Sequence, residues 1–112
     1  MLIYKIFRAD EWAAMQAQGE TAGAPVDLAD GYVHFSTADQ AVETAAKWFA
    51  GAEGLVLLAC ETDRMGADLK WEPSRGGALF PHLYRALNMR DVTWSKPLPL
   101  DAGTHVFPKE ML

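Results

Sequence analysis

The sequence predicts a small α+β domain, with two helices packed on a mixed or antiparallel sheet of five or six short strands. Its 112 residues are 50% hydrophobic and 22% charged, which is enough apolar material for one core. Short runs of β-branched and aromatic residues alternate with two stretches of helical periodicity. No repeat or linker divides the chain. We therefore expect a single domain over residues 1–112, with a core at about 2–97 and an irregular C-terminal tail.

The first third of the chain predicts two strands and one helix. Residues 2–7 are rich in β-branched and aromatic side chains, which is typical of a strand. Asp10 is expected to cap a helix that ends near Gly19. Residues 20–31 have no apolar period and are expected to form a loop. Residues 32–35 predict a short second strand.

The strongest helix signal begins directly after that strand. Thr37 and Gln40 have the spacing of a capping box, and Gly51 is expected to end the helix. Between them, apolar residues recur at helical spacing: Ala38, Ala41, Val42, Ala45, Ala46 and Phe49.

A continuous apolar run at residues 55–60 predicts a central strand that is buried on both faces. Cys60 lies in this run, so we expect a structural thiol whose pKa is raised by burial. Residues 69–72 alternate in polarity, which places Leu69 and Trp71 in the core and Glu72 on the opposite face.

The remaining strands are predicted near prolines. Residues 80–84 are expected to be extended, because proline disfavours a helical conformation in the residue before it. Residues 91–95 are expected to form the last strand, and Pro97 and Pro99 to end the regular structure.

Net charge and composition exclude several classes of protein. The formal charge of −5 disfavours non-specific binding to nucleic acid. No apolar run reaches the ~20 residues of a membrane helix, and the first residues lack the pattern of a signal peptide. With a single cysteine no disulfide framework is expected. We expect a soluble, cytoplasmic protein that does not contact a membrane.

Basic residues gather in the second half of the chain. Residues 73–96 contain four of them against one acidic residue: Arg75, Arg85, Arg90 and Lys96 against Asp91. A local basic region of this kind suits a small anionic ligand such as a nucleotide or a carboxylate. Solvated surface arginines are the alternative interpretation.

Candidate functional residues lie in three segments. His34, Ser36 and Thr37 precede a helix N-terminus, a position that favours an anion. The alternative is structural, since Ser36 and Thr37 can cap the helix and His34 can satisfy a buried carbonyl. Glu72 is a candidate general base or hydrogen-bond acceptor, or else a solvent-facing carboxylate.

In an extended segment, Phe80, His82 and Tyr84 project from one face. We expect His34 and His82 to lie within about 10 Å of each other in one pocket, together with Ser36, Glu72 and Tyr84. The histidines lack the spacing of metal ligands, so no metal site is expected.

These segments resemble a known bacterial family. Residues 31–37 (GYVHFST), 71–73 (WEP) and 79–84 (LFPHLY) look like the signature of the domain-of-unknown-function 952 family, in order and spacing. That family is thought to be distantly similar in fold to the ADP-ribosyltransferases and the RNA 2′-phosphotransferases. The resemblance implies an ADP-ribosyltransferase-like fold and NAD as a candidate cofactor.

The resemblance also implies roles for individual residues. His34 corresponds to the histidine that hydrogen-bonds a ribose, and Tyr84 or Phe80 to an aromatic residue that stacks on the base. The related enzymes usually carry a late glutamate, but His82 stands in the matching segment here. Two hypotheses follow: a domain that binds a nucleotide-like or other small anionic ligand, and an active or degenerate ADP-ribosyl-transferring enzyme with His82 as acid or base.

Overall fold

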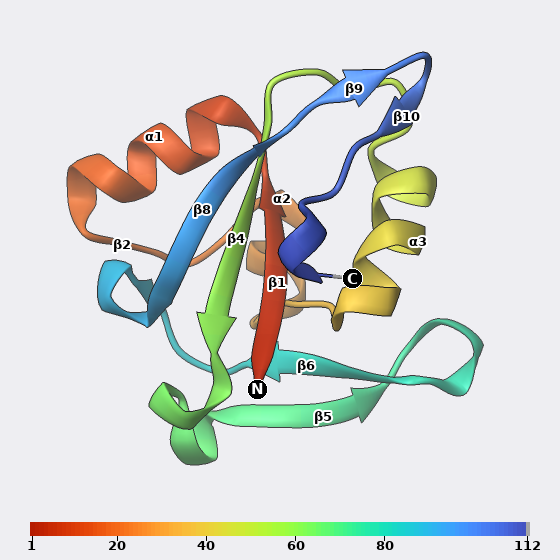
Figure 1. Cartoon of the computed structure of the whole chain (residues 1–112). Helices are drawn as coiled ribbons and strands as arrows, with labels where there is room; N and C mark the ends of the chain where they lie inside the picture. Colours follow the sequence, from red (N-terminus) through yellow and green to blue (C-terminus); the bar gives the residue numbers. More distant parts are fainter. Residues whose placement is uncertain (112) are drawn as a thin grey trace.

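The computed structural model describes residues 1–111 and shows an α+β fold built on two three-stranded antiparallel sheets (Figure 1). The first sheet has the strand order β1–β4–β8, and the second has the order β3–β6–β5. Their bounds are β1 Leu2–Phe7, β3 Val33–His34, β4 Leu55–Glu61, β5 Leu69–Pro73, β6 Leu79–Leu83 and β8 Val92–Leu98.

The two sheets are joined through the residues that follow β3. Tyr4 N donates to Ser36 O at 2.8 Å, and Ser36 N donates to Tyr4 O at 2.9 Å. Phe35 N donates to Pro81 O at 3.0 Å, which continues the β3–β6 pairing. In Figure 1, β5 and β6 run crosswise below the lower ends of β1 and β4. This junction holds His34 close to the first sheet.

Shorter elements complete the described part of the chain. Two further strand pairs are β2 (Glu20–Thr21) with β7 (Leu87–Asn88), and β9 (Leu100–Asp101) with β10 (Thr104–His105). The 3₁₀ turns are Thr62–Arg64, Gly66–Asp68, Arg75–Gly77, Met89–Asp91 and Lys109–Met111.

The first helix, α1 (Ala9–Gln18), ends as predicted at Gly19, which has a left-handed conformation with φ 82°. The predicted cap at Asp10 is wrong. Arg8 is the extended residue before the helix, and its N–H donates to the Glu11 carboxylate at 2.8 Å. The Glu11 side chain, in the first turn, thus accepts a hydrogen bond from the backbone at the N-terminus of the helix.

Residues 20–31 are not the loop that the sequence predicted. They contain β2 and a third helix, α2 (Pro25–Asp30), so the predicted count of two helices is wrong. Pro25 occupies the first turn, Ala24 N donates to the Asp27 carboxylate at 2.7 Å, and Gly31 ends the helix with φ 86°. Asp27 is the only buried side chain of α2. Because the buried position is a carboxylate, the sequence has no apolar periodicity that predicts this helix.

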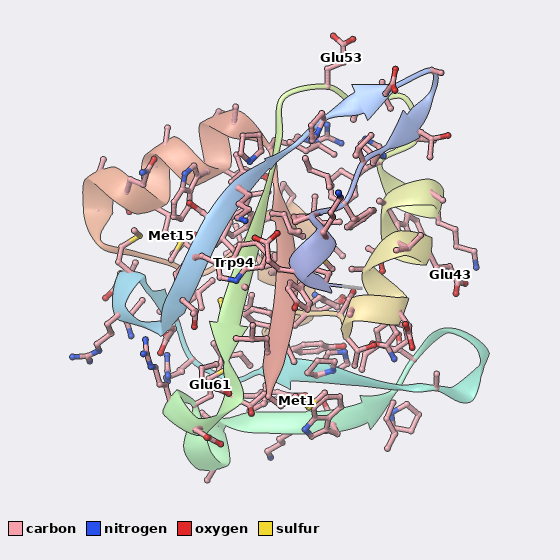
Figure 2. All side chains as sticks on the ribbon, in the orientation of Figure 1. Met1, Met15, Glu43, Glu53, Glu61 and Trp94 are labelled. Carbon is pink, nitrogen blue, oxygen red and sulfur yellow. The ribbon has the colours of Figure 1, made fainter. Side chains whose placement is uncertain are left out.

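The third helix, α3 (Ala38–Trp48), confirms the predicted capping box. Gln40 N donates to Thr37 Oγ1 at 3.3 Å, and Thr37 N donates to Gln40 Oε1 at 3.0 Å. The buried face is narrower than predicted, because Val42 is 48% exposed. Figure 2 shows Glu43 on the outer side of the helix. None of the helices among residues 1–111 is long and apolar enough to span a membrane.

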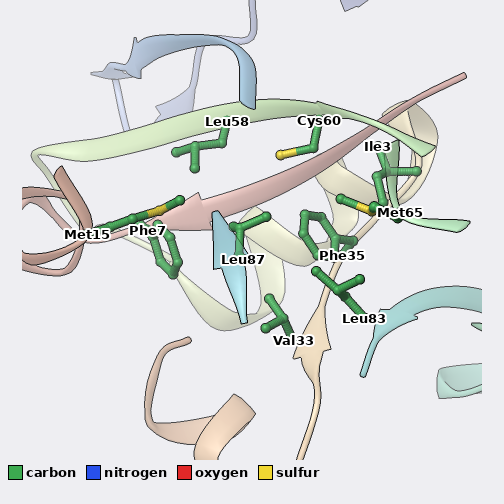
Figure 3. Packing of buried hydrophobic residues seen from close by; sticks show 10 residues of the cluster. All are labelled: Ile3, Phe7, Met15, Val33, Phe35, Leu58, Cys60, Met65, Leu83 and Leu87. Carbon is green, nitrogen blue, oxygen red and sulfur yellow. The ribbon is translucent and has the colours of Figure 1, made fainter. Parts of the chain in front are cut away.

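The first sheet is buried on both faces by two hydrophobic clusters. The first cluster is shown in Figure 3 and comprises Ile3, Phe7, Met15, Val33, Phe35, Leu58, Cys60, Met65, Leu83 and Leu87. The second lies against α3 and comprises Tyr4, Ile6, Ala41, Ala45, Leu55, Leu57, Ala59 and Leu98. Neighbouring residues of β4 alternate between the clusters, which confirms the prediction of a central strand.

Two predictions about the later strands are wrong. Trp71 is 39% exposed rather than in the core, because β5 is an edge strand that pairs only with β6 in the second sheet. The last long strand does not stop before Pro97 but continues to Leu98, and the tail expected to be irregular contains β9 and β10. Proline fits here because β8 is the edge of its sheet.

Cys60 is fully buried in β4, and burial raises the pKa of its thiol to about 12. We therefore expect a thiol reagent to label the native protein slowly, and to label it rapidly once it is unfolded in denaturant. Cys60→Ala should cost about 1–2 kcal/mol of stability, since it leaves only a small cavity. Rapid labelling of the native protein at neutral pH would contradict this structural role.

Candidate functional site

The pairing of β3 with β6 places His34 directly opposite His82. Their ring centroids are 5.3 Å apart, with an angle of 66° between the ring planes. The prediction that both histidines lie within about 10 Å is therefore confirmed.

A tyrosine that the sequence analysis did not select joins these two rings. The Tyr32 ring centroid lies 4.6 Å from that of His34, 4.2 Å from that of His82 and 5.1 Å from that of Tyr84. Tyr32 stands two positions before His34, so strand alternation turns both side chains to one face. That spacing was the signal that could have identified it.

A pocket of about 690 Å³ opens beside the two histidines. Of the predicted site residues, His34, Ser36, Phe80 and His82 line it. The wall also contains apolar rings and charged groups from other elements: Phe35, Trp48 and Phe49, with Lys5, Arg8, Asp10, Glu11 and Asp30. The charged groups come from β1, α2 and the start of α1, and Trp48 comes from α3.

Three predicted site residues do not line this pocket. Thr37 accepts the hydrogen bond of the α3 cap, which is its structural role. Glu72 and Tyr84 contact each other instead, with Tyr84 Oη 2.7 Å from Glu72 Oε1. Ser36 does line the pocket, and its hydroxyl lies 3.1 Å from Thr44 Oγ1.

The floor of the site is a buried ion pair between Lys5 and Asp27. Lys5 Nζ donates to both carboxylate oxygens of Asp27, at 2.9 and 2.7 Å. Asp27 also accepts hydrogen bonds from Ala24 N and from His34 N, at 2.7 and 2.9 Å. One carboxylate, 1% exposed, therefore ties α2 to β1 and β3.

Burial and ion pairing shift the pKa values of Asp27 and Lys5 in opposite directions. Burial alone raises the pKa of the Asp27 carboxyl, but the hydrogen bond from His34 and the charge of Lys5 outweigh it, so this pKa lies below its ordinary value. Burial lowers the pKa of the Lys5 ammonium, and Asp27 opposes that shift only in part. No local sequence signal predicts this pair, because neither residue belongs to a recognisable motif.

His34 contacts a carboxylate through each ring nitrogen. Its Nδ1 lies 2.7 Å from Asp27 Oδ1, and its Nε2 lies 2.9 Å from Asp30 Oδ2. Ionised carboxylates only accept hydrogen bonds, so this arrangement suits an imidazolium ring with a proton on each nitrogen. The Asp30 side chain is 45% exposed and lines the pocket, whereas Asp27 is buried beneath it.

Two of the four basic residues in the region predicted at residues 73–96 form ion pairs with carboxylates. Arg85 donates to both oxygens of Asp91, at 2.7 and 3.1 Å, and Lys96 forms an ion pair with Glu110. The Arg75 side chain lies outside the described part of the structure. Among the described residues, no group of three or more histidine, cysteine or acidic side chains could hold a metal ion.

Fold and site together define a small α+β domain with a histidine-lined pocket where two antiparallel sheets meet. The chain belongs to the family described as "Protein of unknown function (DUF952)", whose model matches residues 6–95. The family resemblance seen in the sequence is thereby confirmed, while the likeness to ADP-ribosyltransferases stays a prediction.

Solved structures of one similar protein agree with this fold. A crystal structure of protein CC0527 from Caulobacter crescentus is 57% identical, with a TM-score of 0.91 over 95% of this chain and 94% of that one. A crystal structure of its double mutant gives the same values. Its solution NMR structure is 58% identical, with a TM-score of 0.84 over 93% of this chain and 90% of that one. No curated protein matches this chain.

Proposed function

We propose that this chain binds a small nucleotide-like ligand in the pocket beside His34 and His82. The observation that carries the proposal is the pair of imidazoles, 5.3 Å apart, on the wall of a pocket of about 690 Å³. This volume is in the usual range for small-molecule sites, which combine apolar walls with a few convergent polar groups. Trp48, Phe49 and Phe80 supply aromatic surface for a base.

The contact between His34 and Asp30 supports an acidic group on the ligand. An exposed carboxylate oxygen already lies 2.9 Å from His34 Nε2. A phosphate or carboxylate oxygen of a ligand can take the same place once Asp30 moves aside. Arg8 lies on the same wall and adds positive charge, while Asp10 and Glu11 restrict how much negative charge the pocket accepts.

NAD and ADP-ribose are the candidate ligands that these residues suggest. In this pocket His34 would hold a phosphate oxygen, Ser36 would contact a ribose hydroxyl, and Phe80 would stack on a base. An enzyme that transfers ADP-ribose from NAD is the second candidate, favoured by the short contact between His82 and Glu72. Against it, the late glutamate of the related enzymes has no counterpart at residues 79–84, where His82 stands.

Calorimetry with NAD and with ADP-ribose tests binding, and a nicotinamide-release assay tests catalysis. We expect both ligands to bind the wild type. His34→Ala should reduce the affinity roughly 2- to 12-fold, which corresponds to the free energy of one lost hydrogen bond. Asp30→Asn removes a competing charge from His34 and should increase the affinity for ADP-ribose by a similar factor.

His105→Gln is the matched control for these variants. His105 is buried outside the pocket and contacts the Ala52 carbonyl at 2.8 Å, a bond that glutamine can replace. Its ligand affinity should equal that of the wild type. Nicotinamide release would assign the enzyme instead of the binding domain, and the absence of both binding and release would overturn the nucleotide proposal.

A further inference from the structure

Glu72 joins His82 to Tyr84 through a single oxygen atom. Glu72 Oε1 lies 2.8 Å from His82 Nδ1, and Tyr84 Oη donates to the same oxygen at 2.7 Å. The hydrogen bonds from Tyr84 and His82 lower the pKa of the Glu72 carboxyl, and the bond to Glu72 raises the pKa of Tyr84 to about 12. At neutral pH, therefore, Glu72 is a carboxylate and Tyr84 keeps its proton.

This contact determines the tautomer of His82. An ionised carboxylate accepts hydrogen bonds and cannot donate them, so the nitrogen beside it, Nδ1, carries the proton. In the neutral ring, Nε2 then has a free lone pair. Among the described residues, Nε2 of His82 has no hydrogen-bond partner. His82 lines the pocket and Glu72 does not.

His34 is arranged in the opposite way, although its ring lies only 5.3 Å from that of His82. Both of its nitrogens are within hydrogen-bond distance of carboxylates, so a proton on either nitrogen has an acceptor and neither nitrogen is left without a partner. The two neighbouring histidines thus differ in their partners: His34 contacts a carboxylate through both nitrogens, and His82 through Nδ1 alone.

We propose that Glu72 is a positioning residue that holds His82 with its proton on Nδ1, so that Nε2 accepts a hydrogen bond from a hydroxyl group of the ligand. This inference rests on the proposed function and further specifies the ligand. The ligand carries an acidic oxygen for His34 and, a few ångströms away, a hydroxyl donor for His82. A ribose phosphate has both groups, and a 2-hydroxy acid has them in a smaller frame.

Nitrogen-15 NMR of the histidine rings tests the tautomer on the free protein, in a pH series whose high-pH plateau reports the neutral rings. We expect His82 to carry its proton on Nδ1 in the wild type. Glu72→Ala should shift the ring toward the other tautomer, because the acceptor is lost. Glu72→Gln keeps an amide oxygen as acceptor and should restore much of the wild-type spectrum, while Tyr84→Phe should leave the tautomer unchanged.

His105 serves as an internal reference in the same spectra. Its Nε2 lies 2.8 Å from the Ala52 carbonyl oxygen, which fixes the proton on Nε2. That signal should be identical in every variant, and a change in it would report a general loss of structure. A His82 ring with its proton on Nε2 in the wild type, or one indifferent to Glu72→Ala, would overturn the inference.

A second measurement concerns the ligand. Glu72→Ala should weaken binding of ADP-ribose roughly 2- to 12-fold and leave the binding of an analogue without ribose hydroxyls unchanged. Equal weakening of both ligands would contradict the acceptor role of Nε2. If neither ligand binds the wild type, the proposed function fails, while the NMR result on the free protein still decides the tautomer.

Discussion

Asp27→Ala is expected to destabilise the protein by about 3–5 kcal/mol, the usual cost of leaving a buried charge without its partner. The Lys5 ammonium is 7% exposed and would lose the carboxylate that accepts two of its hydrogen bonds. His34 would lose the partners of its backbone N–H and of Nδ1. Urea unfolding, followed by circular dichroism, measures the change.

Two controls separate the buried charge from a general effect of substitution. Glu43→Ala removes an exposed ion pair with Lys47, whose atoms are 3.7 Å apart, and should change stability by about 0.5 kcal/mol or less. The double variant Lys5→Met with Asp27→Leu removes both charges and should recover much of the lost stability. A cost below about 1 kcal/mol for Asp27→Ala would show that the pair is not essential to the fold.

Phe7→Ala is expected to cost about 3–5 kcal/mol, because the Phe7 ring is completely buried in the first hydrophobic cluster. Trp71→Ala removes a larger side chain from the edge strand β5 and should cost about 1 kcal/mol or less. Thermal and urea unfolding of both variants check this order. Equal losses would mean that Trp71 packs in the core, as its alternating pattern had suggested.

The residues that could be identified from the sequence are those whose signal is local. Thr37 and Gln40 are three positions apart, and that spacing is sufficient to predict the start of α3. The apolar run of β4 indicated a strand buried on both faces, which the two clusters confirm. Alternation along residues 80–84 put His82 on the same face as Phe80 and Tyr84. That His82 lies close to His34 was an expectation, which the pairing of β3 with β6 confirmed.

Tertiary structure decided what depends on distant partners. The exposure of Trp71 was set by the place of β5 at the edge of its sheet, which no local pattern encodes. Helix α2 was missed because it buries a carboxylate rather than an apolar face.

The hydrogen-bond partners of the site residues also depend on tertiary structure. Lys5 and Asp27 are 22 residues apart, and Glu72 and His82 are 10 residues apart. By itself the sequence determined the family and the two histidines. Which nitrogen of each ring carries a proton was decided by carboxylates that only the folded chain brings within hydrogen-bond distance, because hydrogen bonding acts over a few ångströms and not along the sequence.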